Sequence, residues 1–146
     1  MSIISWKLFW RINAIVIAIL VTILSLIPHP GEIEAPINWS AWLASLLLGD
    51  PMSGDKVSHF LAYGALGFFS ALGFTKSWQQ LILLFGGLLL YGAFIEVLQA
   101  YGGVRNGDAQ DLVANGLGAF CGIAGAVLLR HLFRRYALHL KTPIVR

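Results

Sequence analysis

Charged residues are scarce in this chain. Only 12% of its 146 residues are Asp, Glu, Lys or Arg, whereas 58% are hydrophobic, and the mean hydropathy is +0.76. A soluble domain carries roughly twice that share of charge, because water has to solvate its surface. We therefore predict one membrane domain spanning 1–146, most of whose surface faces lipid.

Cysteine and recognised catalytic motifs are also nearly absent. The single cysteine, Cys121, has no partner for an intramolecular disulfide and lies among glycines in an apolar run, which is typical of a small packing residue. The sequence contains no P-loop, dinucleotide-binding glycine pattern, serine nucleophile elbow or zincin motif. The net charge of +3 is not organised into a basic stripe, so we exclude nucleic acid as a partner.

Four apolar stretches are long enough to cross a bilayer, with tilt or local thinning for the shorter ones. They are 8–27, 57–74, 81–98 and 112–129. Each must be helical, because an unpaired backbone polar group in hydrocarbon costs several kcal/mol. The sequence therefore predicts an all-α, polytopic membrane protein with a bundle of four transmembrane helices. A cleaved signal peptide is the alternative for the first stretch, but no small-x-small cleavage site follows it.

A shorter amphipathic segment lies in the long connection between the first two stretches. Trp39, Trp42, Leu43, Leu46 and Leu47 recur at helical spacing. This pattern predicts a helix over about 37–48 that is too short to span and lies in the interface on the outer face, with its tryptophans at headgroup level. A plain soluble loop is the alternative.

The distribution of Lys and Arg predicts the orientation. Eight of the ten lie on one side: Lys7, Arg11, Lys76, Arg130, Arg134, Arg135, Lys141 and Arg146. Because cytoplasmic loops carry the excess of Lys and Arg, both termini should be cytoplasmic. All seven acidic residues then fall in the outer half. The basic tail, 130–146, suits the anionic headgroups of the cytoplasmic leaflet.

Polar side chains gather at the outer ends of the second, third and fourth stretches. The members are Asp55, Lys56, His59, Tyr63, Glu96, Gln99, Arg105, Asp108, Asp111 and Asn115. Ionisable groups inside a membrane usually mark a functional site. Simpler roles remain open: Asp55 and Asp108 as helix N-caps, His59 and Tyr63 as bundle residues, and Arg105 as an ion-pair partner.

This cluster carries more negative than positive charge. Its four carboxylates face only Lys56 and Arg105, with His59 adjustable. A divalent cation, a cationic group of a substrate or protonation of Glu96 would relieve the excess, and we favour protonated Glu96. No metal-ligand spacing is recognisable, so we expect no metal and no cofactor. Elsewhere, Ala114, Gly118, Gly122 and Ala126 repeat every fourth residue and predict a close-contact helix face.

Several of these polar motifs, in this order, resemble the VanZ-like family. Residues 55–64 are similar to its D-K-x-x-H-F-x-x-Y stretch, 96–99 to E-x-x-Q, 105–111 to R-x-x-D-x-x-D and 115–119 to N-x-x-G-A, while 25–28 resemble its first-span exit. The resemblance implies a multi-pass protein of the bacterial inner membrane linked to the cell envelope. The family takes its name from a protein associated with low-level resistance to the glycopeptide antibiotic teicoplanin. It supplies no reaction.

Three functions therefore remain open. A membrane-embedded enzyme would use His59, Glu96 and Asp111 as candidate acids and bases on a lipid headgroup or other amphiphile. A binding protein would hold a lipid-linked envelope precursor or a glycopeptide-type compound unchanged. In both cases the remaining cluster residues would contact the ligand: Asp55, Lys56, Tyr63, Gln99, Arg105, Asp108 and Asn115. A non-catalytic structural subunit or homo-oligomer, docked through the glycine face, is the third.

Overall fold

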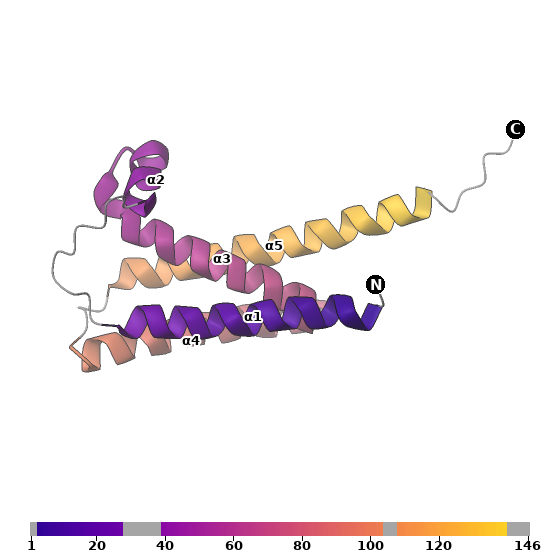
Figure 1. Cartoon of the computed structure of the whole chain (residues 1–146), viewed down its shortest axis with the longest axis horizontal. Helices are drawn as coiled ribbons and strands as arrows, with labels where there is room; N and C mark the ends of the chain where they lie inside the picture. Colours follow the sequence, from indigo (N-terminus) through magenta and orange to yellow (C-terminus); the bar gives the residue numbers. More distant parts are fainter. Residues whose placement is uncertain (1–2, 28–38, 104–107, 140–146) are drawn as a thin grey trace, which may run out of the picture.

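The computed structural model describes residues 3–27, 39–103 and 108–139. Over these ranges the chain forms helices and no strand, which confirms the all-α prediction. The helices are α1 (Ile3–Leu26), α2 (Trp39–Leu48), the short 3-10 turn η1 (Pro51–Ser53), α3 (Gly54–Phe74), α4 (Trp78–Tyr101) and α5 (Ala109–His139). The beginning of α1 and the end of α5 lie toward the same end of the molecule (Figure 1).

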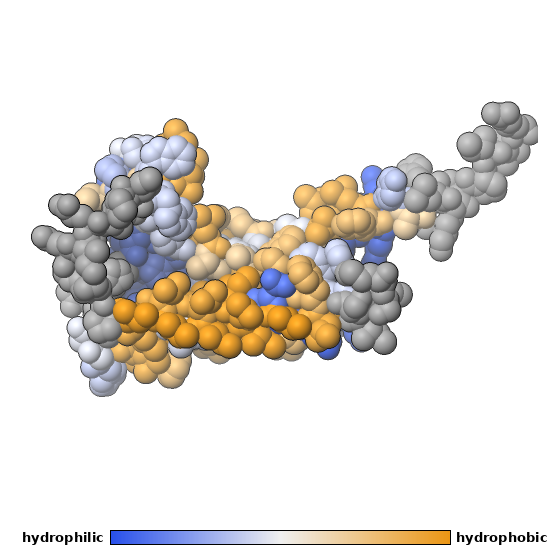
Figure 2. Space-filling model, viewed as in Figure 1, coloured by the Kyte–Doolittle hydropathy of each residue, from blue (hydrophilic) through white to orange (hydrophobic). Residues whose placement is uncertain are grey.

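Four helices are long and apolar enough to cross a membrane, as predicted. The qualifying segments are Trp6–Leu26, Pro51–Phe74, Trp78–Tyr101 and Ala109–Ala137. Each begins before the apolar stretch found in the sequence, because helical hydrogen bonding continues through end residues that hydropathy does not count. Helix α5 runs through 130–139, so the first part of the predicted basic tail is helical, while 140–146 lies outside the described residues. Hydrophobic residues cover most of the bundle's middle in Figure 2.

The closest helix contact joins α3 and α5 through glycines. A Cβ added to Gly118 would overlap the carbonyl of Phe60, and one added to Gly122 would overlap the carbonyl of Gly64. The predicted close-contact face is therefore confirmed, and its partner is α3 of the same chain. Because the two backbones approach so closely, the beginning of α3 and the beginning of α5 are also held together.

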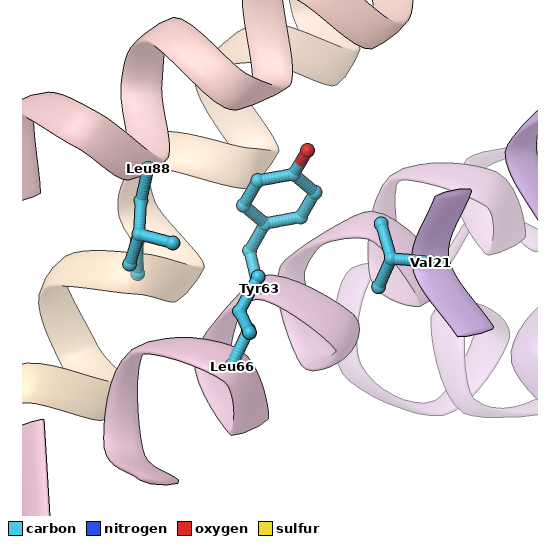
Figure 3. Close-up of a cluster of buried hydrophobic side chains, with 5 residues drawn as sticks. Val21, Tyr63, Leu66 and Leu88 are labelled. Carbon is cyan, nitrogen blue, oxygen red and sulfur yellow. The ribbon is translucent and has the colours of Figure 1, made fainter. Parts of the chain in front are cut away.

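A small apolar core fixes α3 against the other spanning helices. The ring of Tyr63 lies between Leu88 of α4 and Val21 of α1, with its hydroxyl pointing away from Leu66 (Figure 3). Ala119 of α5 completes this buried group. The core thus sets the position of a residue that the sequence analysis assigned to the site.

Helix α2 packs beside the beginning of α3 (Figure 1). Its Ser40 and Ala44 are buried, and a Cβ on Gly54 would overlap the backbone of Ala41. Trp39 and Trp42 are both exposed. The predicted amphipathic helix is therefore present from Trp39 onward, while residues 37–38 lie outside the described ranges. Its location at the membrane interface stays a prediction.

Two arginines bind the opposite end of α3. Arg11 of α1 donates a hydrogen bond from Nε to the carbonyl of Gly73 at 3.0 Å, and its guanidinium lies over the ring of Phe74. Arg130 of α5 donates to the carbonyls of Ala71 and Thr75. The last carbonyls of a helix lack intrahelical partners, so these side chains complete the end of α3. The sequence analysis used both arginines only as indicators of orientation.

Candidate functional site

The structure brings the predicted polar residues together at the end of the bundle where α2 meets α3. Nine of the ten are described there: Asp55, Lys56, His59, Tyr63, Glu96, Gln99, Asp108, Asp111 and Asn115. Arg105 lies outside the described residues. Hydrophilic residues gather at this end of the molecule in Figure 2. The contacts among these side chains link α3, α4 and α5.

Lys56 joins the first turn of α3 to the beginning of α5. Its Nζ donates a hydrogen bond to Asp108 Oδ2 at 2.9 Å and lies 3.6 Å from Asp111 Oδ1. Asp111 is almost fully buried, so a nearby cation offsets the cost of removing its charge from water. The Lys56 ammonium is therefore already held by two carboxylates of α5.

The aspartates differ in their relation to helix ends. Asp108 is an N-cap, since its Oδ1 accepts a hydrogen bond from the backbone N–H of Gln110 at 2.8 Å. Its own N–H donates to Glu96 Oε2 at 3.3 Å, which ties α5 to α4. Asp55 is not an N-cap, because α3 begins at Gly54 and Ser53 occupies the cap position. The capping interpretation holds for Asp108, alongside its ion pair, and is wrong for Asp55.

His59 occupies the centre of the cluster. Its Nδ1 lies 3.0 Å from Asn115 Oδ1 on α5. Its Nε2 lies 3.7 Å from Asp55 Oδ1 and 3.7 Å from Asp111 Oδ2. An amide oxygen can only accept, so Nδ1 carries the hydrogen of this bond and Nε2 is directed toward the two carboxylates.

Tyr63 lies one helical turn below His59 on the same face. Its side chain is 2% exposed, and its hydroxyl has no hydrogen-bond partner among the described residues. Gly92 of α4 makes room for it, since a Cβ there would lie 3.4 Å from the Tyr63 hydroxyl and 3.3 Å from Asn115 Nδ2. A buried hydroxyl is normally paired, so this one points to a group that enters the site.

A cavity of about 520 Å³ adjoins this cluster between α1 and α3. One part of its wall is apolar: Ile17, Leu20, Val21, Leu24, Leu61 and Ala62. The other part carries polar or aromatic side chains: Ser25, Trp39, Asp55, Ser58, His59, Tyr63 and Gln99. The cavity therefore offers hydrocarbon surface and hydrogen-bonding groups in one space.

The α1 side of this cavity was not predicted from the sequence. Gln99 Nε2 donates to the carbonyl of Ser25 at 2.9 Å and so anchors the C-terminal end of α1 to α4. The residues of α1 that line the cavity look like any other lipid-facing residues in the sequence. The only available signal was Ser25, a polar residue near the end of an apolar stretch.

The site's chemistry is that of proton exchange, hydrogen bonding and cation binding. Asp55, His59 and Asp111 each offer one ligand atom, and these atoms lie within 4.8 Å of one another, so the three residues could hold a metal ion. Glu96 and Lys56 are not among the residues lining the cavity. Of the candidate acids and bases, His59 is the one that reaches the cavity directly.

Comparison with known proteins adds a family relationship. A family model described as VanZ/LLP1 matches residues 4–130, which is most of the chain. No curated protein and no solved structure matches the chain. The matched range contains all the cluster residues and every residue that lines the cavity.

Proposed function

The chain belongs to the VanZ/LLP1 family, and from this premise we propose that it binds an amphiphilic molecule of the bacterial cell envelope in the cavity between α1 and α3. One observation carries the proposal. The cavity wall changes from leucines of α1 to Asp55 and His59 within a single space. Ligand sites of this kind combine a largely apolar lining with a few placed polar groups, which suits an acyl or prenyl chain joined to a polar head.

The cavity's exposure supports entry from the lipid. Leu20 and Leu24 of α1 and Leu61 of α3 all line it and are all exposed on the surface of the bundle. Trp39 of α2 lies at the polar end, where an aromatic side chain suits headgroup depth. An amphiphile in the outer leaflet could therefore place its chain against α1 with its headgroup near His59.

The polar end favours a headgroup that donates hydrogen bonds. Asp55 and the Gln99 side-chain oxygen are acceptors, and His59 can accept or donate according to its protonation. The Lys56 ammonium, which would otherwise suit a phosphate or carboxylate, already contacts Asp108 and Asp111. Amine or hydroxyl groups, as in lipid headgroups, lipid-linked precursors and glycopeptides, match these acceptors.

Processing of the bound headgroup is the second candidate function. It is favoured by one contact pattern, because His59 reaches the cavity while two carboxylates face its Nε2. A histidine whose Nδ1–H is held by an acceptor, as His59 is by Asn115 Oδ1, presents Nε2 as a general base. Recovery of the ligand chemically unchanged after incubation would favour binding, whereas a new product that requires His59 would favour catalysis.

A purely structural subunit has less support. The glycine face of α5, which favoured docking of a partner helix, is packed against Phe60 and Gly64 of α3. That face is therefore not available to a second protein.

We also propose that the protein lies in the bacterial inner membrane with both termini in the cytoplasm. Arg130, Arg134 and Arg135 lie on α5 at and beyond the end of α3 that is opposite the site, and cytoplasmic segments carry the excess of such residues.

Lipidomics of the purified protein tests the proposal. We expect wild-type protein to retain a specific amphiphile through detergent exchange, and Ala62→Phe, which places a ring in the cavity, to lose it. Ala124→Phe is the matched control, because Ala124 is exposed on α5 and does not line the cavity. Tyr63→Phe should also weaken retention without lowering stability, since its hydroxyl has no partner among the described residues. Equal lipid content in all four proteins would contradict the proposal.

A further inference from the structure

Three potential metal ligands converge at the polar end of the cavity. Asp55 and His59 are four residues apart on α3 and share a face, and Asp111 is in the first turn of α5. Their ligand atoms all lie within 4.8 Å of one another. No ligand spacing is recognisable in the sequence, because Asp111 joins the other two only through the close α3–α5 contact.

The histidine is oriented as a ligand would be. Because Asn115 Oδ1 accepts from Nδ1–H of His59, Nε2 of the neutral ring directs its lone pair toward Asp55 and Asp111. Ligating histidines in metalloproteins typically donate their other N–H to such an acceptor, which fixes the tautomer and the ring plane. Asn115 is 1% exposed, so this orientation is set within the packed bundle.

The separations fit a coordination sphere after a small adjustment. Zinc–ligand bonds of about 2.0–2.1 Å place tetrahedral ligand atoms roughly 3.4 Å apart. The two distances from His59 Nε2 to the carboxylate oxygens are both 3.7 Å, so each would shorten by a few tenths of an ångström.

An independent observation also indicates a ligand at this place. Tyr63 lines the same cavity one turn below His59, and its buried hydroxyl has no hydrogen-bond partner among the described residues. A water molecule or ligand group beside a bound ion would give it a partner.

We propose that Asp55, His59 and Asp111 form a binding site for a divalent transition-metal ion. Mn²⁺ and Zn²⁺ are the ions that this ligand set suits best. One imidazole nitrogen with carboxylate oxygens suits these ions better than Ca²⁺ or Mg²⁺, which prefer oxygen ligands alone. Three protein ligands leave positions for water or for an anionic group in the cavity. The site stands independently of the amphiphile, since all of its ligands belong to the protein.

Calorimetric titration of chelator-treated protein in lipid nanodiscs with Mn²⁺ or Zn²⁺ tests the site. We expect one ion per chain, with the dissociation constant raised at least tenfold in His59→Ala and Asp111→Asn, and about tenfold or more in Asn115→Leu. His131→Ala and Asp50→Asn are matched controls, because both residues are exposed and outside the cluster. Unchanged affinity in the ligand variants, or the absence of saturable binding, would overturn the proposal.

A spectroscopic measurement on the unmodified protein avoids any effect of substitutions on folding. Electron spin echo modulation of the Mn²⁺-loaded protein should show one coupled ¹⁴N nucleus, and the signal should change when the histidines are labelled with ¹⁵N. Mn²⁺ bound with oxygen ligands alone would overturn the proposed ligand set. The metal site can fail in these experiments while the lipid-retention test succeeds, and the reverse, so the two proposals are separable.

Discussion

The hydroxyl of Tyr91 on α4 lies 2.7 Å from the hydroxyl of Thr22 on α1 and donates a hydrogen bond to the carbonyl of Ala18 at 2.9 Å. Helix α1 supplies most of the cavity's apolar wall, and this contact holds it against α4 in the middle of the bundle. The position of that wall therefore depends on a polar contact inside the membrane.

Tyr91→Phe should loosen α1. Loss of the hydroxyl removes both contacts, and interhelical hydrogen bonds in membranes contribute about 1 kcal/mol to the free energy of unfolding. Reversible unfolding in mixed micelles measures the effect. Tyr101→Phe is the control, because Tyr101 is exposed at the end of α4. Equal stability of the two variants would show that the contact does not hold α1.

Gly122→Ala should destabilise the α3–α5 pair by about 1–3 kcal/mol or more, because the new methyl group meets backbone atoms of Gly64 that cannot move alone. Gly86→Ala is the matched control, since nothing lies near its added Cβ. Thermal unfolding in the same detergent checks both. A similar midpoint for the two variants would contradict the close packing of these helices.

Arg130→Lys should weaken the end of the bundle where α3 ends. The guanidinium donates from Nη1 to Thr75 Oγ1 at 3.2 Å and from Nη2 to the carbonyls of Ala71 and Thr75, a fork that an ammonium cannot reproduce. We expect a loss of about 1–3 kcal/mol in the free energy of unfolding. Arg134→Lys, at an exposed position on the same helix, should change little. If both variants lose the same stability, the effect is general to α5 and not due to the end of α3.

Asp50 should titrate below the usual range of an aspartate. Hydrogen bonds from the Ser53 hydroxyl and the Met52 N–H lower its pKa by stabilising the carboxylate. Because the folded pKa is the lower one, this stabilisation of the α2–α3 corner is present at neutral pH and is lost as the pH falls through it. Ser53→Ala should raise the pKa, as followed by NMR of ¹³C-labelled aspartate, whereas Ser45→Ala should not. An unchanged pKa in Ser53→Ala would contradict the turn geometry.

The number and type of helices could be predicted because the bilayer imposes one requirement on every span. Hydropathy located all four, and the polar residues gathered at the ends of three of them indicated where the site lies. The α3–α5 pairing could be predicted only in part. The small residues of α5 indicated a contact face, but not which helix packs against it.

The cavity could not be predicted because a leucine that faces lipid and one that faces a cavity look the same in sequence. Leu20 and Leu24 were simply parts of an apolar stretch. The roles of Arg11 and Arg130 were missed for a related reason, since charge counts do not reveal which helix end a guanidinium reaches. Protonation of Glu96 stays a prediction; its Oε2 accepts from the N–H of Asp108.

Photocrosslinking tests the central claim, an amphiphile held between α1 and α3, most directly. A phospholipid with a diazirine in its acyl chain would be irradiated with the protein in nanodiscs, and the adducts mapped by peptide mass spectrometry. We predict adducts on Leu20, Leu24 and Leu61. The yield of these adducts should fall when the co-purified lipid extract is added as a competitor before irradiation. Leu83 and Leu90 of α4 are more exposed but do not line the cavity, so the competitor should not lower the yield of adducts on them. Labelling that follows exposure alone, with no displacement at the three cavity leucines, would contradict the claim.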